Sequence, residues 1–343
     1  MIDHATRDLT ITVEAGITIG ELQKILAKEN QELPIDVPLP EQATLGGAIA
    51  CDASGPRRYG RGTLRDYLIG VTAIDGEGRL FRAGGRVVKN VAGYDFCRLL
   101  IGSHGMLGIV MQATLKVVPR AETSAAVTLP IEDWERLGAV LDQLAESTTR
   151  PVAIEALGGP HRDAALAESA HGVAALCVLF EGSRPDVEWQ VQRLQDELRD
   201  SAPQPTVLGE SAFRPLLAWL RDCDCHGDDA FAVRVQTRPS RVVDAVRTLL
   251  DFDPGVSWRA HAGNGVVTAR LSREPDDGFA TALRDRLRPK LAEQDALVIP
   301  LRFPPRAEFT HAALWGHTGD ANEILRAIRD QFDPQRRLNP GRF

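Results

Sequence analysis

The sequence predicts an α+β protein of two domains, and three observations carry that prediction. The chain has 343 residues, whereas a typical domain holds about 150. Strand-like alternation and helix-like spacing of apolar residues follow one another along the chain, which indicates mixed structure. Glycine is dense between residues 44 and 108 and sparse from about residue 121 onward. We therefore expect a glycine-rich domain followed by a second domain that is built differently.

Local patterns predict the elements of the first domain. Residues Asp8–Val13 alternate between polar and apolar and predict a strand. Thr18 and Glu21 have the spacing of a capping box, which starts a helix. Leu33–Pro40 must be extended, because proline fixes its own φ and disfavours helix in its predecessor. Further on we expect strands at Leu68–Ile74, Leu80–Arg82 and Ile109–Val118, and a short helix at Asp95–Ile101.

Strand-like runs alternate with helical stretches in the second domain. This order favours an antiparallel sheet that helices cover on one side. The expected strands are Ala125–Leu129, Val173–Leu179, Ala230–Val235, Val266–Arg270 and Ala296–Ile299. The expected helices are Trp134–Leu144, Val187–Leu198, Ser240–Leu250 and Phe279–Leu291.

Composition excludes several classes of protein. Lys and Arg total 40 against 47 Asp and Glu, and the net charge of -7 argues against a nucleic-acid partner, which needs a positive field. Charges interrupt every long apolar run, so we expect no transmembrane segment. The N-terminus lacks the features of a signal peptide, and five cysteines are too few for a disulfide framework. We expect a cytoplasmic protein, with peripheral membrane association through partner subunits as an alternative.

Two glycine clusters, Thr44–Gly55 and Gly102–Gly108, lie within the first domain. Glycine is needed where a backbone approaches a ligand closely or adopts positive φ. Neither cluster has the Rossmann or Walker pattern. One such cluster is as consistent with tight turns as with a binding loop. Two clusters with the sequence KNVAGYD between them favour a ligand site.

The residues of this region resemble a known family. The run from Thr44 to Gly70, and the run from Arg86 to Pro119, are similar to the FAD-binding domain of the vanillyl-alcohol oxidase / p-cresol methylhydroxylase (PCMH) type. Within that type they resemble most the FAD-binding (E) subunits of glycolate oxidase, on the sequences GPRR at Gly55–Arg58 and KNVAGYD at Lys89–Asp95. The resemblance returns at the C-terminus as FDPQRRLNPGR, Phe332–Arg342.

The resemblance implies a division into domains and a cofactor site. Residues 1–120 would form the FAD-binding domain, 121–330 a cap domain that binds substrate, and 331–343 a tail returning to the FAD domain. FAD would lie between two α/β subdomains and be held mainly by main-chain atoms, which explains how an acidic protein binds an anionic cofactor. The implied contacts are Thr44, Gly46 and Gly47 at the diphosphate and ribityl chain, Cys51, Asp52, Ala53, Ser54 and Gly55 along the flavin, and Ile109 at the adenosine.

The start of the chain departs from the family pattern. Family members begin with a subdomain that carries a GGGT-type diphosphate loop, and about sixty such residues do not precede the first strand here. We therefore expect a truncated first subdomain. Either the gene start is placed too late, or this is a genuine short form that binds FAD weakly or not at all. Half of a two-sided site would leave much of the cofactor in water, so the short form predicts a colourless or flavin-poor protein.

The second domain holds the candidate catalytic and substrate-binding residues. Catalytic relatives carry an HxGDGNxH type of motif, and the nearest segment here, His261–Thr268, keeps one histidine but lacks the acid and the last histidine. His261 is thus a candidate general base, with a structural histidine at a strand turn as the alternative. Arg302 and Arg306 flank a Pro-Pro turn and are candidates for binding a carboxylate, or are surface arginines.

Two other clusters carry weaker hypotheses. Cys223, Cys225 and His226 lie close together, but a zinc site needs a fourth ligand and wider spacing between ligand pairs, so we expect no metal site. The arginines of Arg57–Arg61 form a basic spot that contacts phosphate, contacts a partner subunit, or is solvated.

The resemblance implies an FAD-dependent oxidoreductase that is one subunit of a glycolate oxidase (dehydrogenase) complex. Its substrate would be glycolate or a similar 2-hydroxy acid, oxidised in the case of glycolate to glyoxylate. The resemblance also implies two partners, a catalytic flavoprotein subunit and an iron–sulfur subunit. No cysteine spacing here fits a cluster, so the iron–sulfur chemistry would lie on another chain. Two alternatives stay open: a self-sufficient FAD-dependent 2-hydroxy-acid dehydrogenase, and a non-catalytic assembly subunit that has lost FAD.

Overall fold

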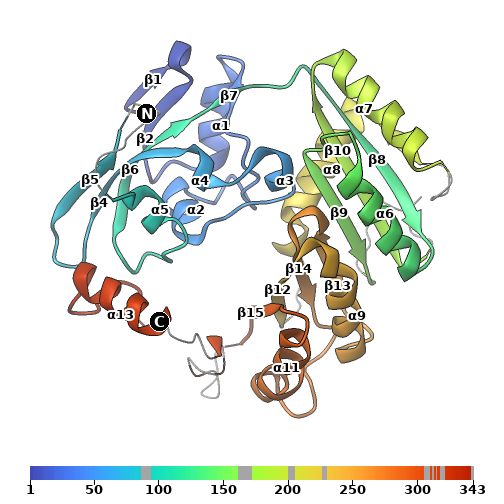
Figure 1. The fold of residues 1–343 in the computed structure, drawn as a ribbon. Coiled ribbons are helices and arrows are strands. Elements are labelled where there is room, and N and C mark those ends of the chain that lie inside the picture. The colour runs from blue at the N-terminus through green and yellow to red at the C-terminus, as the bar shows by residue number, and fades with distance from the viewer. Residues whose placement is uncertain are drawn as a thin grey trace. The chain divides into compact units, whose positions relative to one another are not determined.

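The chain folds into two units in the computed structural model (Figure 1). Unit 1 comprises Met1–Arg120 and Thr318–Phe343, and unit 2 comprises Ala121–His317. The structure describes residues 1–85, 94–160, 172–199, 205–225, 230–304, 310, 313, 315–316 and 321–340. Each unit has its own hydrophobic core. The return to unit 1 begins at Thr318, earlier than the expected residue 331, so helix α13 (Ala321–Phe332) belongs to unit 1.

Unit 1 is built on a five-stranded antiparallel sheet with the strand order β1-β2-β6-β4-β5. The strands are β1 (Asp3–Ala5), β2 (Thr10–Glu14), β4 (Leu68–Ile74), β5 (Leu80–Gly84) and β6 (Ile109–Lys116). β3 (Gln31–Glu32) and β7 (Val118–Pro119) form a separate pair. The first expected strand begins two residues late, because Thr6–Asp8 forms a 3₁₀ turn that ends at Leu9 in the left-handed region, with φ 53°.

The helices of unit 1 pack beside this sheet. Helix α1 (Ile19–Ala27) begins at Thr18, whose hydroxyl accepts a hydrogen bond from the Glu21 amide at 3.2 Å, so the expected N-terminal cap is confirmed. Its buried residues Ile19, Leu22 and Leu26 repeat at helical spacing. The other helices are α2 (Leu45–Cys51), α3 (Arg58–Arg61), α4 (Leu64–Tyr67) and α5 (Phe96–Leu100).

Unit 2 contains an eight-stranded sheet in which all neighbouring strands are antiparallel, with the order β11-β8-β10-β9-β13-β14-β12-β15. The predicted α+β class with an antiparallel sheet is confirmed. Its strands are β8 (Thr123–Ile131), β9 (Ala153–Gly158), β10 (Ala174–Gly182), β11 (Thr206–Leu208), β12 (Ala232–Gln236), β13 (Ser257–His261), β14 (Val266–Arg270) and β15 (Leu297–Arg302). β9 and β13 were not expected. Both are buried along their whole length. β9 is apolar apart from Glu155, so its sequence lacks the polar–apolar contrast that reveals a strand, whereas β13 has only five residues to show it.

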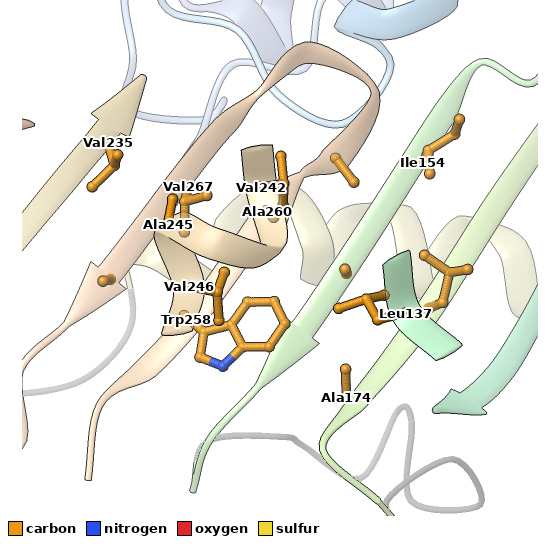
Figure 2. Packing of buried hydrophobic residues seen from close by; sticks show 14 of the residues in the cluster. Leu137, Ile154, Ala174, Val235, Val242, Ala245, Val246, Trp258, Ala260 and Val267 are labelled. Atoms are coloured by element: carbon orange, nitrogen blue, oxygen red, sulfur yellow. The ribbon is translucent and has the colours of Figure 1, made fainter. Parts of the chain in front are cut away.

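Helices cover both faces of this sheet, so the expectation of helices on one side is wrong. The helices of the main core are α6 (Trp134–Glu146), α7 (Arg184–Glu197), α9 (Val242–Phe252), α10 (Phe279–Ala282) and α11 (Arg288–Ala292). Figure 2 shows Val242, Ala245 and Val246 of α9 over β13, the strand that carries Trp258 and Ala260.

Helix α8 (Glu210–Asp222), which was not expected, packs on the opposite face. It buries Phe213, Leu216 and Leu220 in a separate cluster with Cys177 and Leu179. Pro215 lies inside this helix, and proline disfavours the interior of a helix. None of the helices in the described part of the chain is long and apolar enough to cross a membrane.

Candidate functional site

The first glycine cluster forms helix α2 and the turns at its two ends. Thr44 caps the helix, because its hydroxyl accepts a hydrogen bond from the Gly47 amide at 3.2 Å. The amide of Gly46 donates to the carbonyl of Ala15 at 2.8 Å. A Cβ on Gly46 would lie 3.0 Å from that of Ala15. Glycine at position 46 therefore lets the start of α2 approach the turn after β2.

The turn after α2 carries unpaired polar groups. Asp52 ends the helix in the left-handed conformation, with φ 48°. Its Oδ1 atom is buried and has no hydrogen-bond partner among the described residues. Within the same part of the chain, the amides of Ser54 and Gly55 donate to no acceptor. Cys51 is exposed beside them. The turn thus contains two amides and one carboxylate oxygen that nothing in the described part of the chain satisfies.

The structure brings the second glycine cluster against this turn. The amide of Gly102 donates to the carbonyl of Ile49 at 3.0 Å, and that of His104 to the carbonyl of Ala50 at 2.8 Å. The cluster then leads into Ile109, the first residue of β6, whose side chain is 54% exposed. The predicted residues Thr44 to Gly55 and Ile109 therefore belong to one region of unit 1. Of the sequence KNVAGYD, residues 89–93 lie outside the described residues.

These residues fit FAD. An isoalloxazine ring presents carbonyl oxygens and one N–H group, which match the free amides of Ser54 and Gly55 and the unpaired oxygen of Asp52. The match is made by main-chain groups and one carboxylate, and it requires no lysine.

Arg57 is not part of a solvated basic spot. It is 6% exposed, and its Nη2 lies 2.9 Å from Oδ1 of Asp36, while its Nη1 lies 3.2 Å from Oε2 of Glu32. A Cβ on Gly55 would lie 2.5 Å from the carbonyl oxygen of Asp36. Arg57 thus holds the extended segment Leu33–Pro40 against the turn after α2. The sequence alone does not reveal this role, because it does not show which acidic residues lie beside the arginine.

In unit 2, one face of the sheet carries a row of cationic and hydroxyl side chains. Register places Ser257, Arg270 and Arg302 at one level across β13, β14, β12 and β15, and Arg259, Thr268 and Arg234 at the next. Directly opposed residues of an antiparallel sheet share a face. The alternation of polar and apolar residues along β12, β13 and β14 is the sequence pattern that could have revealed this row of side chains.

A narrow cavity, with room for about one water molecule, opens on this face. The sheet contributes Ser257, Arg259, Thr268 and Arg270, and the opposite wall comes from Trp219 of α8 and from the 3₁₀ turn Cys223–Cys225. Burial raises the pKa of the Cys225 thiol, and Arg302 opposes that rise, which places its charge near the same turn. Arg306 and His226 lie outside the described residues. The described residues contain no cluster of His, Cys, Asp and Glu that could hold a metal ion.

His261 lies in a buried charged cluster at the edge of this cavity. It is 5% exposed, and its Nδ1 lies 2.6 Å from Oε1 of Glu155, which is fully buried. Its Nε2 lies 3.4 Å from Nη2 of Arg259. Because a guanidinium only donates, Nε2 is the acceptor in the contact with Arg259, and Nδ1 donates a hydrogen bond to Glu155.

Arg259 joins this cluster to helix α8. Its guanidinium donates to the carbonyl of Leu220 and pairs with Asp224. Burial alone would lower the pKa of Arg259, but Asp224, Cys223 and Glu155 raise it above its ordinary value. Burial also raises the pKa of the Cys223 thiol to about 12. The cluster is therefore an internal ion network in which each charge has an opposite neighbour.

Comparison with known proteins extends these observations. The family model described as "FAD binding domain" matches residues 1–84. Glycolate oxidase subunit GlcE of Escherichia coli is 36% identical over 158 residues, which are 46% of this chain and 44% of that relative. The D-2-hydroxyglutarate dehydrogenase of Xanthomonas citri is 27% identical over 100% of this chain and 77% of its own length.

A solved structure of alkyldihydroxyacetonephosphate synthase aligns with 99% of this chain and 66% of its own, with a TM-score of 0.68 and 17% identity. At that identity the likeness concerns the fold alone. The match to the Escherichia coli relative covers less than half of that protein.

Residues 1–84 thus match an FAD-binding domain, and FAD is the cofactor that this match indicates. The relatives to which the chain is similar include FAD-linked oxidoreductases that act on 2-hydroxy acids.

Proposed function

We propose that unit 1 holds FAD between the turn after α2 and the glycine segment 102–109. The observation that carries this proposal is the set of unpaired groups at Asp52, Ser54 and Gly55 in the domain that matches the FAD family model. When bound, FAD supplies a two-electron acceptor for a hydride. The protein's own contribution is to orient the cofactor and to offer main-chain donors to its oxygens.

We further propose that the substrate is a small 2-hydroxy acid, with glycolate the first candidate. Relatives named as glycolate oxidase subunits and as D-lactate and D-2-hydroxyglutarate dehydrogenases support this class. Arg270 and Arg302 are the proposed carboxylate partners, because guanidinium binds carboxylate in a planar, two-bonded geometry. Ser257 lies at the same level of the sheet and offers a hydroxyl.

His261 has the surroundings of a positioning residue. One ring nitrogen is bonded to Glu155 and the other accepts from Arg259, so neither is open to a substrate hydroxyl in this arrangement. We propose that His261 holds Arg259 beside the cavity and that the base for the hydroxyl proton is another group.

The relatives named as glycolate oxidase subunits support a role inside a complex. We propose that the chain works with a second flavoprotein subunit and an iron–sulfur subunit. Co-purification of the three chains, with glycolate turnover by the complex, is the expected result. Turnover of glycolate by this chain alone, with an artificial acceptor, would favour a self-sufficient dehydrogenase instead.

Thiol protection tests the cofactor site. Cys51 is exposed at the proposed flavin position, and Cys225 is a half-buried thiol in unit 2. We expect FAD to slow the alkylation of Cys51, measured by mass spectrometry, and to leave Cys225 unchanged. Equal rates at Cys51 with and without saturating FAD would contradict the proposed site.

A further inference from the structure

The C-terminal tail after α13 makes a set of specific contacts within unit 1. Asp333 is fully buried, and its carboxylate accepts hydrogen bonds from the amide of Arg337 at 3.0 Å and from the amide of Leu338 at 2.7 Å. The carbonyl of Phe332 accepts from the amide of Gly76 at 2.8 Å. A Cβ on Gly76 would lie 2.3 Å from Oδ1 of Asp333. Only glycine at position 76 therefore lets the hairpin turn between β4 and β5 approach the tail this closely.

The tail is therefore folded into a defined turn that starts at an anchored point. Phe332 adds to the anchor, because its ring packs edge-on against Phe81 and Phe96, with centroids 5.8 and 5.9 Å away. Such aromatic pairs favour this geometry. An anchored turn presents the residues that follow it in one orientation.

The residue that this anchored turn positions is Asn339. Its side-chain amide donates to the carbonyl of His104, and a Cβ on Gly105 would lie 2.9 Å from Nδ2 of Asn339. Asn339 itself has φ 40°, a conformation that asparagine tolerates better than most residues. His104, with φ 50°, is the centre of the second glycine cluster.

The contact continues into the proposed cofactor site. The amide of His104 donates to the carbonyl of Ala50, two residues before Asp52. A hydrogen-bonded path thus runs from Asn339 through His104 to the end of α2. The tail touches both the turn at Gly76, which connects β4 and β5, and the segment that leads into Ile109.

We propose that Asn339 is a positioning residue for the FAD site: it fixes the peptide of His104 and thereby the glycine segment 102–108 against the turn after α2. This inference rests on the proposed FAD site. Asn339 itself is exposed, and its role is to hold the segment in a conformation ready for the cofactor before FAD arrives. Preorganisation of this kind strengthens binding because less ordering is left to do.

A matched pair of variants tests this. Asn339→Asp keeps the size and the backbone tolerance of the residue but removes the donor. Gln335→Glu makes the same amide-to-carboxylate change at an exposed position of the same tail. We expect the FAD dissociation constant, from a fluorescence titration of the full chain, to rise about fivefold to tenfold for Asn339→Asp, the worth of one hydrogen bond. We expect no change for Gln335→Glu.

Hydrogen exchange supplies a measurement that does not need FAD. Without the cofactor, amides 102–106 should exchange faster in Asn339→Asp than in the wild type, while amides of β4 should not change. Equal FAD affinity in Asn339→Asp and the wild type would overturn the positioning role alone. Failure of the wild type to bind FAD would overturn the proposed function, and this inference with it.

Discussion

The two units build their candidate sites from different parts of the chain. In unit 1 the proposed FAD site consists of amides and carbonyls around α2 and the segment 102–109, with Asp52 as its one unpaired carboxylate. In unit 2 the cavity is lined by arginine and hydroxyl side chains that the strand register places on one face. The first site depends on the conformation of the backbone, and the second depends on the identity of the side chains.

This difference predicts opposite responses to mutation. A site made of main chain tolerates the loss of a side chain but not a Cβ added where two backbones meet. A site made of charged side chains is destabilised when one member is removed, because its partner is then a buried charge without an opposite neighbour. Four substitutions compare the two units.

The largest effect is expected in unit 2. Glu155→Ala removes the buried acceptor of His261 and the carboxylate that lies 4.0 Å from Nε of Arg259, and removing one partner of a buried ion pair costs about 3–5 kcal/mol. Urea denaturation measures the loss. The control is Glu132→Ala, which removes an exposed partner of Arg136 and should cost no more than about 1 kcal/mol. Equal losses for the two variants would show that the buried network does not stabilise the unit.

The next effect is a glycine substitution in unit 1. Gly55→Ala places a Cβ 2.5 Å from the carbonyl oxygen of Asp36, which is backbone and cannot swing away. Overpacking of this kind costs about 1–3 kcal/mol. The control Gly16→Ala has no heavy atom within 4 Å of its new Cβ. We expect the midpoint of denaturation to fall for Gly55→Ala and to stay near the wild type for Gly16→Ala.

A side-chain deletion in unit 1 should cost less. Thr44→Ala removes the hydroxyl that caps α2, and loss of such a cap costs about 1 kcal/mol. Because the proposed site is made of main chain, FAD should still bind once the chain is folded. A loss of FAD binding much greater than the loss of stability would show that Thr44 contacts the cofactor directly.

The smallest effect depends on pH. Burial would raise the pKa of Asp75, but hydrogen bonds from the side chain and amide of Arg79 and from the amide of Glu77 outweigh it and hold the pKa below 3.8. A lowered carboxylate pKa gives stability that is present above the unfolded-state pKa and is lost as pH falls through the folded-state pKa. Asp75→Asn should therefore cost under about 1 kcal/mol at pH 7.

The cost of Asp75→Asn should shrink as the pH falls below 3.8, the ordinary value of an aspartate. Chemical denaturation of both proteins at several pH values measures this. If the difference in free energy of unfolding between the two proteins stays constant at every pH tested, the charge of Asp75 does not contribute to stability.

Local patterns in the sequence predict much of unit 1 and less of unit 2. The capping residue Thr18 and the strand Leu68–Ile74 follow from spacing alone, because each is set by neighbours in the chain. β9 was missed because it is apolar apart from Glu155 and looks the same as any apolar run. β13 alternates polar and apolar residues, but over only five positions.

The candidate sites show the same limit. The two glycine clusters predicted a ligand site, because glycine is needed where a backbone approaches a ligand closely, and the resemblance supplied the identity of that ligand as FAD. The partnership of His261 with Glu155 joins residues 106 positions apart, and the contact of Asn339 with His104 joins residues 235 apart. Such pairs depend on the register of strands and on the return of the tail, which no local pattern records.

The central claim is that FAD is held by the main chain of two glycine segments in unit 1. Amide hydrogen exchange of the full chain with and without FAD tests it most directly. The account predicts slower exchange on FAD addition at the amides of Ser54 and Gly55 and across residues 102–109, with no change at β13 and β14. Unchanged exchange in both glycine segments at saturating FAD would contradict it.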